Sequence, residues 1–230
     1  VDGTQFFVDL VSVTAPSSAT VTYPGSDLSG CTDEDAYNYN AAATEDCNGD
    51  NSCCEHLEQI TIAEARALGV GHPVIVQGVV TSPNWFIHAD YPDGREYTIQ
   101  DATAGVALFG FDLIDLDLAI GNEVRITGET DEHNRKFQVM VSSLSDIEIL
   151  GNATVPEPQL ITVTNLYDNG EAYESELITI EDVTPFGDYT WPTEGNYANI
   201  IISDNGLAIT TLRIDDNATE IDGSPEPGWP

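Results

Sequence analysis

Oxygen-bearing side chains at alternate positions give the segment 30–54 the clearest potential for chemistry. Asp46, Asn48 and Asp50 are each separated by one residue, and Gly49 among them permits a sharp backbone turn. Hard cations such as Ca²⁺ take about six to eight oxygen ligands in proteins. The spacing therefore predicts a calcium-binding loop.

The loop has only the first half of an EF-hand pattern. Counting Asp46 as the first position, Leu57 occupies the twelfth, where an EF-hand loop carries glutamate. We expect oxygen atoms upstream in the same segment to complete the shell. The predicted metal ligands are Asp33, Asp35, Asn38, Asn40, Asp46, Asn48 and Asp50. The alternative interpretation is a solvated acidic turn held by disulfides.

The same segment resembles a known type of repeat. It begins G-C-T-D, continues with N-Y-N and D-C-N-G, and closes with S-C-C. This pattern is similar to the short, disulfide-stapled calcium-binding repeats of secreted proteins from marine Bacteroidetes, which are akin to thrombospondin type 3 repeats. Tyr37 stands where many members carry a further cysteine. The resemblance implies a calcium-binding joint between domains of a secreted protein.

All four cysteines of the chain lie in this segment, at Cys31, Cys47, Cys53 and Cys54. Four cysteines allow three connectivities, and a bond between the two adjacent cysteines is disfavoured by strain. We expect Cys31 and Cys47 each to pair with one of the adjacent two. Paired cysteines are typical of an oxidising compartment, so we expect a secreted or cell-surface protein.

The chain is strongly acidic, with 40 Asp and Glu residues against 6 Lys and Arg, a formal net charge of −34. Such a chain repels phosphate backbones and anionic membranes, so we expect no nucleic-acid partner. This negative charge also favours the binding of divalent cations. Because no apolar run reaches the roughly 18–20 residues that cross a bilayer, we expect no membrane span. No signal-peptide pattern precedes Val1, which favours either a processed start or an artificially chosen one.

The composition, with 41% hydrophobic residues, is ample for packed cores. The predicted fold class is mainly β, with OB-like Greek-key barrels. We divide the chain into an N-terminal β segment (1–29), a calcium-binding disulfide loop (30–56), an OB-like barrel (57–150) and a second, incomplete OB-like unit (151–230). The N-terminal segment contains two β-rich runs, 4–13 and 18–23.

The predicted barrel begins with a short helix. Thr61 and Glu64 form a capping box and Gly69 is a stop signal. Five short β runs follow, at 73–82, 95–101, 105–111, 122–130 and 136–144. Gly78 marks the bend of a long first strand. The sequence DLIDLDLAI lies where OB barrels insert a short helix or loop.

The barrel region also resembles a family. TIAEARAL, I-Q-D-A-T-A-G-V (Ile99–Val106) and G-N-E-V-R-I-T-G-E are similar to OB-fold modules attached to secreted Bacteroidetes proteins, including extracellular nucleases. The resemblance implies an OB fold and an accessory role. It identifies no catalytic residue.

A weaker copy of the same order follows a linker at 151–158. LITVTNL matches the helix, while 176–185, 196–206 and 206–215 match the first three strands. No fourth or fifth strand is recognisable before Pro230, so we expect open strand edges. The N-terminal runs would pair with such an edge within one chain or between chains, and head-to-tail pairing between chains would build a filament. The alternative is that this is a piece of a longer protein.

Catalytic frameworks are missing from the sequence. The histidines are scattered, and neither a nucleophile elbow nor a P-loop occurs, so we expect no enzyme. Trp85 and Tyr91 lie in a connection that OB folds use to hold ligands. They would either stack on a glycan or cap the barrel end.

The predicted function is that of a secreted, calcium-stabilised structural or adhesive protein. Its expected partners are further copies of itself, assembled into an extracellular filament, or other domains of a longer chain. The alternatives are an accessory OB-fold module of a larger secreted hydrolase, such as a nuclease, and a carbohydrate-binding module.

Overall fold

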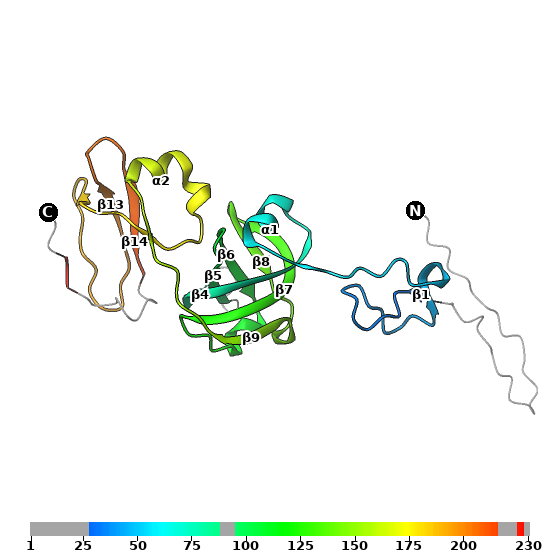
Figure 1. Cartoon of the computed structure of the whole chain (residues 1–230). Helices are drawn as coiled ribbons and strands as arrows, with labels where there is room; N and C mark the ends of the chain where they lie inside the picture. Colours follow the sequence, from blue (N-terminus) through cyan, green and yellow to red (C-terminus); the bar gives the residue numbers. More distant parts are fainter. Residues whose placement is uncertain (1–27, 88–94, 216–224, 228–230) are drawn as a thin grey trace, which may run out of the picture. The chain divides into compact units, whose positions relative to one another are not determined.

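The computed structural model describes residues 28–87, 95–215 and 225–227. The chain divides into two compact units, Val1–His56 and Leu57–Pro230, and each is considered by itself (Figure 1). The predicted N-terminal strands at 4–13 and 18–23 lie outside the described residues. In the described ranges, no helix is long and apolar enough to cross a membrane.

The described part of the first unit, residues 28–56, contains very little regular structure. Strands β1 (Ser29–Gly30) and β2 (Glu45–Asp46) pair in parallel, and a 3₁₀ turn, η1 (Cys47–Gly49), follows. Its fully buried apolar residues among those described are Cys31, Ala36 and Cys47.

A closed five-stranded barrel dominates the second unit. Its strands are β4 (Pro73–Ile87), β5 (Arg95–Gln100), β6 (Gly105–Gly110), β7 (Asn122–His133) and β8 (Lys136–Met140). They are paired in the order β4-β5-β6-β8-β7, and β7 returns to pair with β4. Only the β6–β8 pair in this circuit is parallel. This mixed, closed order confirms the mainly β, OB-like fold.

Two shorter strands extend the barrel sheet. β3 (Gln59–Ile60) pairs in parallel with β4, and β9 (Ile147–Asn152) pairs antiparallel with β7. Neither strand is expected from the sequence. β9 also occupies the first two residues of the segment 151–158, which is a linker in the sequence-based division.

The helix that precedes the barrel forms as the capping residues predict. α1 (Ile62–Leu68) has Thr61 as N-cap with a complete capping box to Glu64, and Gly69 follows at φ 79°. Ile62 and Ala65 face the barrel and are buried. The helix therefore closes one end of the core.

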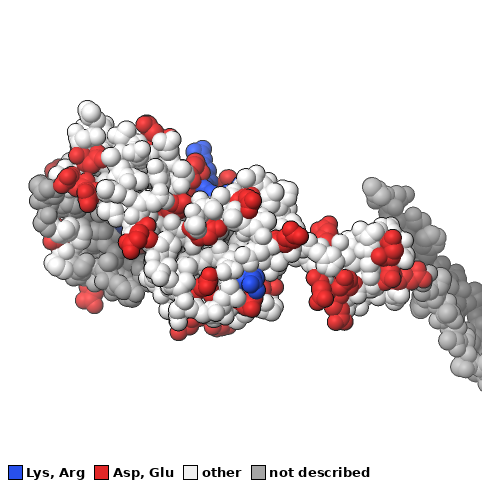
Figure 2. Space-filling view, viewed as in Figure 1, with Lys and Arg blue, Asp and Glu red and all other residues white. Residues whose placement is uncertain are grey.

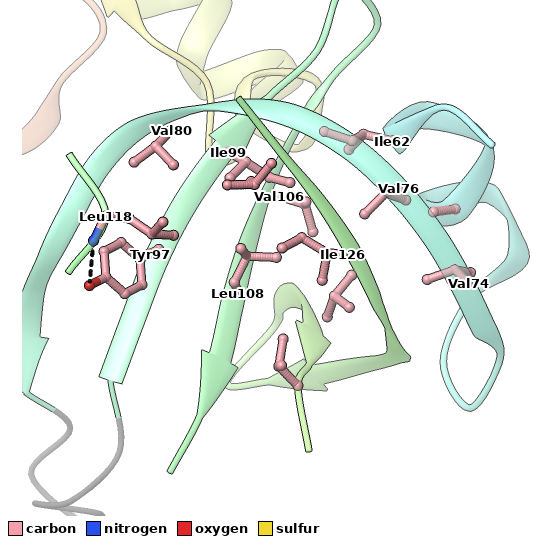
Figure 3. Close-up of a cluster of buried hydrophobic side chains, with 14 of the residues drawn as sticks. Ile62, Val74, Val76, Val80, Tyr97, Ile99, Val106, Leu108, Leu118 and Ile126 are labelled. Atoms are coloured by element: carbon pink, nitrogen blue, oxygen red, sulfur yellow. Dashed lines mark hydrogen bonds between the residues drawn. The ribbon is translucent and has the colours of Figure 1, made fainter. Parts of the chain in front are cut away.

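Alternating apolar residues fill the barrel with one continuous core of fifteen buried residues (Figure 3). Val74, Val76 and Val80 point inward from β4 toward Ile99 and Val106. This alternation is the period-two pattern of a strand with one buried face.

Tyr97 places its polar group at the end of the core. Its hydroxyl donates to the carbonyl of Leu116 and accepts from the amide of Leu118 at 3.4 Å (Figure 3). Both residues follow the 3₁₀ turn η2 (Asp112–Asp115), which occupies the predicted short-helix position. Burial raises the pKa of the Tyr97 phenol.

The strand ends differ from the predicted ones. β4 continues past residue 82 to Ile87 because Phe86 and Ile87 pair with Glu96 and Arg95 across register shifts. β8 ends early, at Met140. Ser143 then caps the 3₁₀ turn η3 (Leu144–Asp146), whose hydrogen bonds compete with strand extension.

The remaining described residues repeat the start of the barrel. The elements are β10 (Gln159–Leu160), α2 (Val163–Asn169), the 3₁₀ turn η4 (Gly170–Tyr173), β11 (Ile178–Thr179), β12 (Thr184–Pro185), β13 (Ala198–Ser203) and β14 (Thr210–Ile214). β10 pairs in parallel with β11, as β3 does with β4. β12, β13 and β14 form an antiparallel sheet. We call residues 159–215 the second copy.

Candidate functional site

Two disulfides hold the acidic loop together. Cys31 bonds to Cys54 with a Cα–Cα distance of 5.1 Å, and Cys47 bonds to Cys53 at 5.9 Å. Each upstream cysteine is thus paired with one of the adjacent two, as expected. Because the described residues of this unit bury only Cys31, Ala36 and Cys47, the disulfides are the main source of order in 28–56. They also indicate an oxidising compartment.

The upstream candidate ligands serve mainly as turn caps. Asn38 donates from Nδ2 to the Cys53 carbonyl at 2.8 Å, and its Oδ1 accepts from the Glu55 amide at 2.9 Å. Asn40 Oδ1 accepts from the Ala42 amide at 3.0 Å. Each amide oxygen therefore accepts one hydrogen bond from the backbone and keeps a second lone pair.

Asp33 and Asp35 also lie in a turn. Asp33 Oδ1 accepts from the Asp35 amide at 3.0 Å, and its Oδ2 lies 3.4 Å from Nε2 of His56. Asp35 is exposed. Asp33 retains lone pairs for a cation, since a carboxylate offers about four acceptor positions.

The downstream candidates surround a left-handed turn. Asn48 and Gly49 have φ angles of 57° and 76°. Asp46 accepts from the Thr32 hydroxyl, and Asn48 Nδ2 donates to Ser52 Oγ at 3.0 Å. Asp50 Oδ1 accepts from the Ser52 amide at 3.0 Å. Hydrogen bonds from Ser52 lower the pKa of the Asp50 carboxyl.

The structure does not gather the seven predicted ligands into one shell. Within the described ranges, no three His, Cys, Asp or Glu side chains come together as a metal site. The donor types nevertheless suit Ca²⁺, because residues 28–56 carry seven acidic side chains and neither lysine nor arginine. Asp46, Asn48 and Asp50 would hold the ion, and the part of Asn38 and Asn40 in binding it stays a prediction.

Sequence reasoning missed the side chain that links the two halves of this loop. Asn51 Oδ1 accepts from the Thr32 amide at 3.2 Å, and its Nδ2 donates to Thr32 Oγ1 at 2.9 Å. Asn51 has φ 59°, a conformation in which asparagine is favoured. The run N-G-D-N, which ends at Asn51, was the sequence signal that could have indicated this turn.

Only one of the two aromatic candidates, Trp85, belongs to the described part of the chain. The backbone of Trp85 belongs to β4, so this residue lies on a strand and not in a connection. Tyr91 lies outside the described residues. A glycan platform at these positions stays a prediction.

Most basic side chains are neutralised by acids. Among the described residues, ion pairs join Arg66 to Glu174, Arg125 to Glu148, Lys136 to Glu96 and Arg213 to Asp215. Figure 2 shows acidic side chains scattered over the visible face with few basic ones among them. A surface with this excess of negative charge repels the phosphate groups whose contacts dominate nucleic-acid binding.

An open strand edge distinguishes the second copy from the barrel. β6 lies between β5 and β8, and all six of its residues are buried. Its counterpart β14 pairs with β13 on one side, and in the described residues no strand pairs with its other side. Thr211 and Arg213 are exposed, while Ile214 is buried.

The core of the second copy is correspondingly small. Among the described residues, the cluster under its sheet contains three buried residues, Ile200, Ile202 and Ile214, and Ile161 and Val163 are also buried in this copy, against fifteen in the barrel core. Ile201 and Ile209 remain 43% and 41% exposed. A three-stranded sheet with so few buried side chains gains stability from any strand added to its edge.

The second copy is docked on the barrel around Arg66 of α1. Arg66 Nη2 lies 2.8 Å from Glu174 Oε2, and Nη1 donates to the Gly105 carbonyl at 3.2 Å. Glu174 also accepts from the Phe137 amide at 3.2 Å. A Cβ on Gly105 would lie 2.0 Å from the Ser175 carbonyl oxygen, so only glycine fits there.

Equivalent aspartates cap the helix in both copies. The Ile62 amide of α1 donates to Asp101 Oδ2, and the Val163 amide of α2 donates to Asp204 Oδ2, both at 2.9 Å. The two copies differ at the second carboxylate oxygen, Oδ1, of this aspartate. Asp101 Oδ1 accepts from Thr103 and Ala104, whereas Asp204 Oδ1 is buried and without a partner in the described chain.

Asp101 makes barrel stability depend on pH. Partial burial raises its pKa, but hydrogen bonds from Ile62, Thr103 and Ala104 outweigh burial and lower it overall. A lowered folded-state pKa contributes stability above the unfolded value of about 3.9, and this is lost as pH falls through the folded value.

We predict that Asp101→Asn destabilises the barrel at pH 7 by about 1–2 kcal/mol. Thermal melts from pH 7 to pH 3 should show the difference from the unmodified chain shrinking as the pH falls. Asp115→Asn, the same charge change at an exposed site, serves as control. A difference that does not change with pH would refute the role of Asp101.

Comparisons with known proteins show likeness in fold alone. No protein-family model matches the chain, and no curated protein matches it. The OB domain (residues 67–166) of MM0293 from Methanosarcina mazei is 20% identical, with 45% of this chain and 92% of that chain covered and a TM-score of 0.34. The hypothetical protein ygiW from E. coli is 18% identical, with 40% and 90% covered and a TM-score of 0.31.

A further match concerns one part of a larger protein. A putative aspartyl-tRNA synthetase from Leishmania major Friedlin is 12% identical over 47% of this chain, with a TM-score of 0.34. This chain spans 23% of the length of that protein. At these identities and scores the matches carry no argument about ligands or activity.

Proposed function

We propose that the protein is a secreted, non-catalytic structural protein that self-associates by β-strand addition. A strand from residues 1–27 of one copy would pair with the open β14 edge of another. The observation that carries the proposal is the contrast between β6, with strands on both sides, and β14, with a described partner on one side only. An edge strand presents unpaired amides and carbonyls to a further strand.

Head-to-tail addition of this kind gives an open polymer. The donor segment and the acceptor edge are different surfaces of one chain, so each added copy leaves a new donor or acceptor available. The net charge of −34 opposes association at low salt. Because the screening length is about 8 Å at physiological ionic strength and shorter in more concentrated salt, association should strengthen with salt.

Light scattering on the full chain tests this function. We expect the molar mass to grow with concentration, more strongly in 0.5 M than in 0.05 M NaCl, as exposed like charges are screened. Val8→Asp places a charge in the run 4–13 and should abolish growth, while Ser17→Asp, with the same charge outside that run, should not. A chain that stays monomeric at high concentration and high salt would refute the proposal.

We further propose that Ca²⁺ stabilises the acidic loop. The support is the donor set of Asp46, Asn48 and Asp50 in a segment without compensating cations. Calcium at about 100 times its Kd would stabilise this unit by about 2.7 kcal/mol.

We expect a chelator to speed proteolytic cleavage within 28–56 about tenfold or more. It should also lower the unfolding temperature of this unit in calorimetry. Asp46→Asn combined with Asp50→Asn should abolish the calcium effect, while Glu34→Gln serves as a matched control. Identical cleavage rates with calcium and with chelator would dismiss the calcium proposal.

A further inference from the structure

The barrel supplies a template for a strand at the open edge of the second copy. In the barrel, Tyr97 is paired with Leu108 and Ile99 with Val106. In the second copy, Ile200 is paired with Leu212 and Ile202 with Thr210. β14 therefore corresponds to β6, and Leu212 to Leu108.

The next strand of the template runs parallel. β8 lies along the other side of β6, with Val139 beside Leu108. Both side chains are buried in the barrel core. A strand that takes the place of β8 along β14 would run parallel to it and put an apolar side chain beside Leu212.

The run 4–13, TQFFVDLVSV, has one face that suits this position. Side chains alternate between the faces of a strand, so Phe6, Val8 and Leu10 would share one face if this run paired as a strand. The opposite face includes Asp9, which would be costly to bury. The first face would therefore turn toward Ile200, Ile202 and Ile214, with Val8 at the centre.

Charge complementarity selects the direction. With Val8 beside Leu212, a parallel strand puts Asp9 beside Arg213, whereas an antiparallel strand puts it beside Thr211. Asp9 is the only charged residue in 4–13, and Arg213 is the only Lys or Arg after Lys136. Arg213 already forms an ion pair with Asp215 at 3.1 Å and lies 4.2 Å from the centre of the Tyr197 ring, so Asp9 would be a second acidic neighbour of the same guanidinium.

We propose that residues 4–13 of a second copy lie parallel to β14, with Val8 beside Leu212 and Asp9 beside Arg213. This inference rests on the proposed self-association and specifies its partner segment, direction and register. The added strand would occupy the position along β14 that β8 occupies along β6 in the barrel.

Cross-linking of mixed full-length chains tests the direction. A chain with Thr211→Cys is mixed with a chain carrying Phe7→Cys, the parallel neighbour, or Asp9→Cys, the antiparallel neighbour. We expect covalent dimer with Phe7→Cys at a yield at least fivefold above that with Asp9→Cys. The reverse ratio would overturn the parallel register.

The remaining outcomes separate this inference from the proposed function. No cross-link from either mixture, while light scattering still shows association, overturns the register and leaves self-association standing. A cross-link confined within one chain of a Phe7→Cys, Thr211→Cys double variant overturns donation between copies. Absence of both cross-links and association overturns both proposals.

A charge exchange tests the Asp9–Arg213 pair independently. Asp9→Arg and Arg213→Asp should each weaken association about fivefold, as expected for one partly exposed ion pair. The double variant should return to within about twofold of the unmodified chain. Circular dichroism of each variant reports whether the second copy stays folded. Folded single variants without an effect, or a double variant weaker than both, would overturn the pairing.

Discussion

Reduction of the two disulfides is expected to unfold residues 28–56 while the barrel stays folded. The Cys31–Cys54 bond closes a sequence separation of 23 and the Cys47–Cys53 bond a separation of 6. Chain-entropy arguments give about 3 kcal/mol for the longer loop and about 2 kcal/mol for the shorter. The loop unit has only Cys31, Ala36 and Cys47 buried among its described residues, so no core can compensate.

Limited proteolysis with and without reductant measures this effect. We expect cleavage within 28–56 to accelerate at least a hundredfold, while the thermal transition of the barrel is unchanged. Replacement of Cys31 and Cys54 by serine should have a larger effect than replacement of Cys47 and Cys53. Equal protection of the reduced and oxidised loops would contradict the account of this unit.

Arg66→Met is expected to detach the second copy from the barrel. The guanidinium joins Glu174 and the carbonyls of Gly105 and Glu171, and it lies 5.6 Å from the centre of the Phe137 ring. Both members of the ion pair are only 17% exposed. Removing one partner of a mostly buried pair leaves the other without compensation, at a cost of about 3 kcal/mol.

Hydrogen exchange over 170–177 and thermal unfolding measure the loss. The control is Arg125→Met, which breaks an ion pair whose members are 41% and 60% exposed and should cost at most about 1 kcal/mol. Arg66→Met combined with Glu174→Gln should cost less than Arg66→Met alone. Equal losses for Arg66→Met and Arg125→Met would show that the docking does not depend on this ion pair.

Local signals in the sequence predicted most of the barrel. Period-two alternation located the five strands, and Thr61, Glu64 and Gly69 located α1, because these signals act over a few residues. The repeated order also located α2, β13 and β14. The predicted end of β4 was wrong. How far β4 extends depends on its pairing with β5, and a local sequence pattern does not show the partner strand.

Contacts between distant segments could not be predicted in this way. Arg66 and Glu174 are far apart in sequence, and no local pattern indicates that they pair. Asn38 and Asn40 were predicted as ligands from their place in the loop, and the structure shows that their side chains also bond to backbone groups. In a short loop, caps and metal ligands use the same residue types, so spacing alone does not separate them.

Hydrogen exchange at β14 tests the central claim most directly. The full chain is compared at a dilution where it is monomeric and at a concentration where it associates. We predict that amides of Thr210–Ile214 become at least tenfold more protected on association in the unmodified chain and not in Val8→Asp, because a paired edge no longer exposes its amides. Association that leaves these amides as exposed as in the monomer would contradict strand addition at this edge.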